Sequence, residues 1–175
     1  RYWNMVGVKD HHQESLIGQA GEVEPVYDQY ALSFFLFDPD RRKLHLPQHP
    51  DPIDGSSPLT QRREAGYLPV FLTRFRTTLG IDLEQKVLAT TLGQRQRSLV
   101  LMRLQAHVTA ATGNAWLCIA VTPFGPSGFE RHDKAGRYSA DKRMTYLRYL
   151  PAEQRFQINN RIGPVLDSPP THFGV

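Results

Sequence analysis

The stretch from Ser98 to Phe124 decides the fold, and it reads S-L-V-L-M-R-L-Q-A-H-V-T-A-A-T-G-N-A-W-L-C-I-A-V-T-P-F. Its first run alternates apolar and polar residues, which is typical of a half-buried strand. Its second run, 115–121, is almost entirely apolar and predicts a strand covered on both faces. Thr112-Gly113-Asn114 lies between them and suits a turn, so we predict one long hairpin of adjacent strands 98–109 and 115–121. The residues expected to be buried in it are Val100, Met102, Leu104, Ile119 and Val121.

Other strand-like runs surround this stretch. Residues 30–37 and 43–46 flank Asp38-Pro39-Asp40 and predict a second hairpin. Residues 84–91, 142–150 and 154–159 predict further strands, 47–60 is a proline-broken loop, and 61–79 fits either a helix or a strand. Short strands at this spacing predict a mainly β chain: an antiparallel β-sandwich with long hairpins and at most one or two short helices.

Length and composition bound the possible classes of protein. With 175 residues, of which 40% are hydrophobic, the chain is expected to form a single domain, 1–175. It begins with Arg1, so we expect a piece of a longer protein with a neighbouring domain as partner. No apolar run is long enough for a membrane span, and we expect no membrane association. Cys118, the single cysteine, is expected to be a buried, slowly reacting thiol.

The charge pattern gives little support to nucleic-acid binding. The net charge is +4, and the basic residues are scattered along the chain rather than gathered in one patch. A basic nucleic-acid-binding β-domain remains one alternative reading of the sequence.

One loop carries residues of the kind that ligate metals. Two histidines and two aspartates fall within the single segment 45–54 and could supply imidazole and carboxylate ligands. These residues are His45, His49, Asp51 and Asp54. Prolines at 47, 50 and 52 prevent a helix from aligning the histidines, so we expect a solvated loop without a metal. The alternative is a small stand-alone metal-dependent enzyme. No nucleophile elbow or phosphate loop occurs, and we expect no cofactor.

One strand face suggests a binding surface. Arg103, Gln105 and His107 share a face, and hairpin pairing would place Trp116 near them. An aromatic ring beside polar arms could stack on a sugar and hold its hydroxyl groups. Trp3 is a second aromatic candidate for such contacts. The competing interpretation is that Trp116 fills the core and the polar side chains are solvated.

The run from Leu92 to Phe124 resembles the core hairpin of the N-terminal β-sandwich domain of bacterial helical-barrel glycosidases. The residues that carry the resemblance are Arg103, Asn114, Ala115, Leu117, Ile119, Val121 and Pro123. In that family the catalytic carboxylates belong to the helical barrel, so the resemblance implies no catalytic residue here. It implies a non-catalytic accessory or structural domain of a carbohydrate-processing protein, with oligosaccharide as a further partner.

Overall fold

The computed structural model describes residues 3–9, 14–26, 29–51, 53, 57–66, 68–92, 97–110, 113–123, 144 and 146–174. The chain is mainly β, as predicted, and its described part contains short 3-10 turns and no α-helix. The strands are β1 (Trp3–Gly7), β2 (Glu14–Gly18), β3 (Val23–Val26), β4 (Tyr30–Asp38), β5 (Lys43–His45), β6 (Leu59–Arg63), β7 (Val70–Arg76), β8 (Ile81–Leu92), β9 (Arg97–Val108), β10 (Trp116–Thr122), β11 (Leu147–Leu150), β12 (Arg155–Ile158) and β13 (Arg161–Val165). The 3-10 turns are Glu64–Gly66 and Pro151–Glu153.

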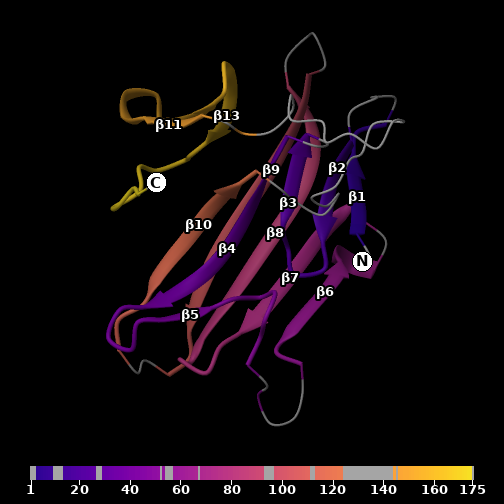
Figure 1. The fold of residues 1–175 in the computed structure, drawn as a ribbon. Helices are drawn as coiled ribbons and strands as arrows, with labels where there is room; N and C mark the ends of the chain where they lie inside the picture. Colours follow the sequence, from indigo (N-terminus) through magenta and orange to yellow (C-terminus); the bar gives the residue numbers. More distant parts are fainter. Residues whose placement is uncertain are drawn as a thin grey trace, which may run out of the picture.

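A six-stranded antiparallel sheet is built around β4 (Figure 1). Its order is β1-β2-β3-β4-β10, and β5 also pairs with β4. Since β10 pairs with β4 from Ala31 to Phe37, β3 and β5 share the other edge of β4. The β4–β5 hairpin confirms the predicted turn at Asp38-Pro39-Asp40.

The second sheet is a four-stranded meander of β6, β7, β8 and β9. The ambiguous segment 61–79 contributes strands to it, with Pro69 standing just before β7 rather than inside a helix. In β8, Leu83, Gln85 and Val87 alternate toward the core. Their antiparallel partners on β9 are Ala106, Leu104 and Met102, so the inner face of β9 follows the predicted alternation.

The two sheets face each other across a core made mainly of apolar side chains. At one end, Ile17 and Val23 of the six-stranded sheet pack with Phe71 and Val87 of the meander. Further along, the core contains Phe34, Leu36, Phe75, Leu79 and Leu83, all at most 5% exposed. Burial of these side chains from both sheets is what holds the sandwich together.

A small three-stranded sheet of β11, β12 and β13 covers one end of the sandwich. Ile158 of β12 packs with Tyr30 and Leu32 of β4, and Met102 and Val121 border the same cluster. Burial raises the pKa of the Tyr30 hydroxyl to about 12.

The predicted hairpin of strands 98–109 and 115–121 is wrong. β9 pairs with β8, and β10 pairs with β4, so the two runs belong to different sheets. The chain crosses from one sheet to the other between them. Ile119, predicted to be buried, is 45% exposed on the core face of β10, and Trp116 on the outer face is 47% exposed, so the apolar run of β10 is not covered on both faces.

Candidate functional site

The structure separates the residues proposed for a sugar platform. Arg103, Gln105 and His107 lie on the outer face of the meander, because Met102 and Leu104 between them point into the core. Trp116 pairs with Phe37, the neighbour of buried Leu36, and so lies on the outer face of the six-stranded sheet. The prediction that these side chains share one surface is wrong, because it depended on direct pairing of β9 with β10.

Trp116 lies in an aromatic cluster of its own. Its indole is 47% exposed and meets the Phe37 ring edge to face, with the ring centroids 5.9 Å apart. The His172 imidazole stacks on the indole at 4.9 Å with the rings 15° from parallel. A flat ring therefore fits against Trp116 without displacing core side chains.

The C-terminal segment is positioned independently of Trp116. The main-chain N–H of Leu166 donates to the carbonyl of Gln154 over 2.7 Å. The Phe173 ring packs against Tyr149 and Phe156, with centroid distances of 5.6 Å and 5.7 Å. These contacts place His172 beside Trp116, an arrangement that the sequence around residue 172 did not predict.

Trp3 lies at the opposite edge of the same sheet. Asn4 and Val6 of β1 point toward the other sheet, so Trp3 lies on the outer face, where it is 49% exposed. Three strands separate β1 from β10. At strand spacing this puts the two indoles on the order of 20 Å apart. Trp3 and Trp116 therefore form separate exposed sites.

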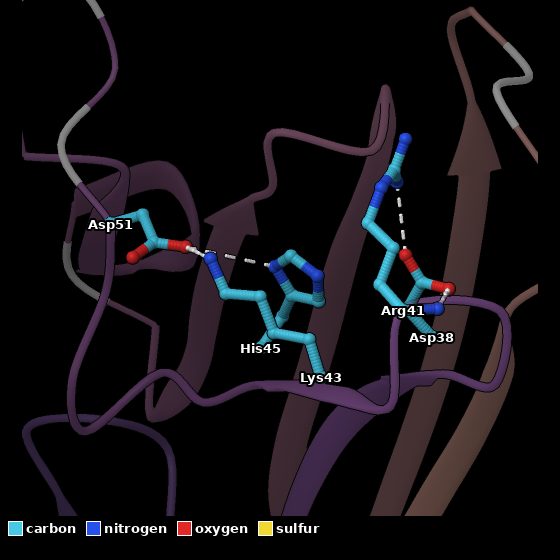
Figure 2. Close-up of polar contacts among 5 residues, drawn as sticks. All are labelled: Asp38, Arg41, Lys43, His45 and Asp51. Carbon is cyan, nitrogen blue, oxygen red and sulfur yellow. Dashed lines mark hydrogen bonds and ion pairs between the residues drawn. The ribbon is translucent and has the colours of Figure 1, made fainter.

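The β4–β5 hairpin contains a compact group of charged side chains (Figure 2). Asp38, whose side chain is 3% exposed, ends β4 and accepts hydrogen bonds from the main-chain N–H of Arg41 at 3.0 Å and from its Nη1 at 2.9 Å. The main-chain hydrogen bond, helped by the guanidinium, lowers the pKa of the Asp38 carboxyl. The carboxylate therefore holds the turn together, as expected for aspartate in a tight turn.

In the same hairpin, the side chains of His45 and Asp51 lie close together, but the Asp51 carboxylate is already bound by the ammonium of Lys43. The Nζ of Lys43 lies 2.6 Å from Oδ2 of Asp51, and Nδ1 of His45 lies 3.8 Å from the same oxygen (Figure 2). Burial, together with the nearby ammonium of Lys43, lowers the pKa of His45. The hydrogen bond from Lys43 lowers the pKa of Asp51. The imidazole is thus neutral at neutral pH, and its Nε2 is buried without a hydrogen-bond partner.

The other two loop residues do not complete a metal site. His49 is exposed and forms a main-chain bridge with Leu46. Asp54 lies outside the described residues. Across the described ranges, no three histidine, cysteine or acidic side chains are grouped closely enough to hold a metal ion.

Two glutamines make polar contacts between the sheets that the sequence analysis did not predict. Gln61 of β6 donates to the Gly18 carbonyl at 2.9 Å and accepts from Asn4 of β1 at 2.8 Å. Gln85 of β8, fully buried, donates to the carbonyl of Gly21 at 2.8 Å. The signal was present in the sequence, because Gln85 occupies a core-facing position between Leu83 and Val87.

Comparison with protein-family models, curated proteins and solved structures finds no match to this chain. In the part of the chain that the structure describes, no helix has the length and apolarity needed to cross a membrane.

Proposed function

We propose that this chain is a non-catalytic module of a carbohydrate-processing protein, and that it binds oligosaccharide on the outer face of the six-stranded sheet at Trp116. The observation that carries the proposal is the stacked contact between Trp116 and His172. It identifies a half-exposed indole whose face receives a flat, polar ring. A pyranose that takes the place of His172 would make the same kind of contact through its C–H groups. The sequence resemblance of the run 92–124 to a glycosidase accessory domain suggested this class of protein, but the run does not form the hairpin on which that resemblance was drawn, so the proposal depends on Trp116.

The two alternative functions have less support. A metal enzyme needs clustered ligands, whereas Lys43 already holds the Asp51 carboxylate beside His45. Nucleic-acid binding needs free positive charge. Several basic side chains are instead in ion pairs with carboxylates, among them Arg41 with Asp38, Arg74 with Glu84, Lys86 with Glu64 and Arg155 with Glu153.

A glycan array followed by calorimetry with the selected oligosaccharide tests the proposal. Trp116→Ala should abolish binding, because the indole face supplies most of the apolar contact. Trp3→Ala is the matched control, since Trp3 is exposed to a similar extent, 49% against 47%, and lies at the far edge of the sheet. Equal losses in both variants, or turnover of a glycoside by the purified chain, would contradict the proposal.

A further inference from the structure

Among the described strands, β9 and β10 are each the last strand of their sheet. Leu117 and Ile119 of β10 pair with Leu36 and Phe34, which are each 1% exposed, so all four side chains belong to the core face of the sheet. Nevertheless, Leu117 is 42% exposed and Ile119 is 45% exposed. Core-facing leucine and isoleucine at this exposure mean that the opposite sheet does not extend far enough to cover β10.

At the opposite side of the sandwich, side chains connect the two sheets, so the exposed core face at β10 is particular to the β9–β10 side. There, the edge strands β1 and β6 are joined by the hydrogen bond from Asn4 to Gln61 at 2.8 Å. Gln61 also donates to the Gly18 carbonyl of β2 at 2.9 Å. Side chains thus bridge the two sheets on that side.

Within the described ranges β9 pairs with β8 alone, and its second edge is regular enough to receive another strand. Its pairing with β8 runs without a shift from Arg97 to Val108, and it contains no proline. Natural edge strands are usually protected by prolines, bulges, short length or charged side chains. β9 is long and has no proline or bulge, and the charge of exposed Arg103 is the protection that it carries. Among the described residues, no strand pairs with its outer row of main-chain N–H and C=O groups.

A strand added to β9 would lie opposite β10. Leu104 of β9 packs against the cluster that contains Phe34 and Leu36, the partners of Ile119 and Leu117. One strand spacing further, about 4.8 Å, brings an added strand over β10 itself. Its inward side chains would cover Leu117 and Ile119.

The charge on β9 indicates what the outward side chains of the added strand should be. Arg103 is exposed on the outer face and lies opposite Lys86, whose ammonium binds Glu64 at 2.7 Å. Within the described residues, no carboxylate pairs with Arg103. Two positive charges at opposite positions of neighbouring strands repel each other. An acidic residue on an added strand, opposite Arg103, would offset this repulsion.

We propose that β9 binds an extended segment of another protein as a fifth strand of the meander. The segment has apolar residues at alternate positions, which face Leu117 and Ile119, and an aspartate or glutamate beside Arg103. Main-chain hydrogen bonds supply the affinity, and the alternate side chains supply the selectivity. This interaction goes beyond oligosaccharide binding and involves a different part of the surface.

The probe is a capped ten-residue peptide in which valine alternates with threonine and one central threonine is replaced by glutamate. A second peptide carries lysine instead of glutamate, and a third is the glutamate peptide with N-methyl groups along one edge. Isotope-labelled protein should show amide shifts along β9 with the first peptide. The lysine peptide should bind about fivefold more weakly. The N-methylated peptide should not bind.

Matched variants of the protein locate the site. Arg103→Glu should reverse the preference between the glutamate and lysine peptides. Arg62→Glu should not, because Arg62 lies in the same cross-strand row but on the far edge strand β6. Ile119→Lys should weaken both peptides while leaving the melting temperature nearly unchanged, since Ile119 is 45% exposed.

Three outcomes would overturn the proposal. The first is equal binding of the N-methylated peptide, and the second is a set of amide shifts outside β9 and β10. The third is protection of the β9 edge amides in the protein alone, together with a dimer in light scattering, which would assign the edge to a second copy of the chain.

Discussion

Gln85 donates from its side-chain Nε2 to the main-chain carbonyl of Gly21 over 2.8 Å, and this contact joins the centre of the meander to the turn between β2 and β3. Gly21 has a positive φ of 83°, and a Cβ there would lie 2.7 Å from both Oε1 of Gln85 and Cε1 of Phe34. Glycine is therefore required at this turn by backbone conformation and by the closeness of the opposite sheet.

Gly21→Ala should lower the free energy of unfolding by about 2–4 kcal/mol, because backbone strain and overpacking act together. Gly66→Ala is the control. Gly66 has a similar φ of 80°, but nothing lies within 4 Å of the position that an alanine methyl would take there, so only the backbone cost of about 1 kcal/mol applies. Urea denaturation of both variants measures the difference. Equal losses would mean that the sheets do not approach each other closely at Gly21.

Truncation of core-facing residues should distinguish the closed core from the exposed core face at β10. Leu83→Ala should cost about 2–5 kcal/mol, as is usual for a fully buried leucine, and Leu83 is 1% exposed. Ile119→Ala should cost less than about 1 kcal/mol, because water already reaches nearly half of that side chain. Chemical denaturation checks both values, and a large loss at Ile119 would show that β10 is covered in the free chain.

His45 should make the folded state less stable as the pH falls. Its pKa in the folded chain is lowered from the ordinary value of 6.5, mainly by burial, so below that pH the unfolded chain takes up the proton first. The free energy of unfolding should therefore decrease from about pH 7 to about pH 5, and His45→Gln should show a smaller decrease. Thermal melts across this range measure both. The same pH dependence in the variant would rule out His45 as its source.

The thiol of Cys118 should react slowly in the native chain. Burial raises the pKa of this thiol, which reduces the thiolate that attacks a labelling reagent. Cys118 is only partly buried, however, since β10 is an edge strand. We expect labelling with a disulfide reagent to be slower than in urea-unfolded chain but to go to completion without global unfolding. Native labelling as fast as that of the unfolded chain would contradict the burial.

The sequence predicted local structure well where periodicity is strong. The alternation at 100–104 correctly indicates a strand and its inner face, whereas Ala106 and Val108 of the same face are exposed. Asp38-Pro39-Asp40 correctly indicates a turn. The partner of each strand could not be predicted in the same way. β9 could pair with the run before it or the run after it, and only packing across the two sheets decides between them.

At the candidate site, too, the local placement of residues was predictable and their long-range contacts were not. The row Arg103, Gln105 and His107 lies on one face as expected, but Trp116 lies on the opposite side of the sandwich. The stacking of His172 on Trp116 joins residues far apart in the sequence and carries no local signal. At the loop, the side chains of His45 and Asp51 do meet, but the ammonium of Lys43 holds the carboxylate, a contact that the order of residues in the loop does not indicate.

The pairing of β10 with β4 also governs the order in which the chain acquires its structure. Thr122 and Ala31, which are hydrogen-bonded across these strands, lie 91 residues apart, whereas β6 to β9 pair with their neighbours in sequence. Long loops close slowly, so the meander should form before the larger sheet is complete. On a ribosome adding about 5–20 residues per second, the free edge of β4 waits roughly 5–20 s for β10 to be synthesised across that 91-residue interval. During this interval the aromatic-rich strand β4, paired with β3 and β5 on one edge only, presents its other edge unpaired to neighbouring chains.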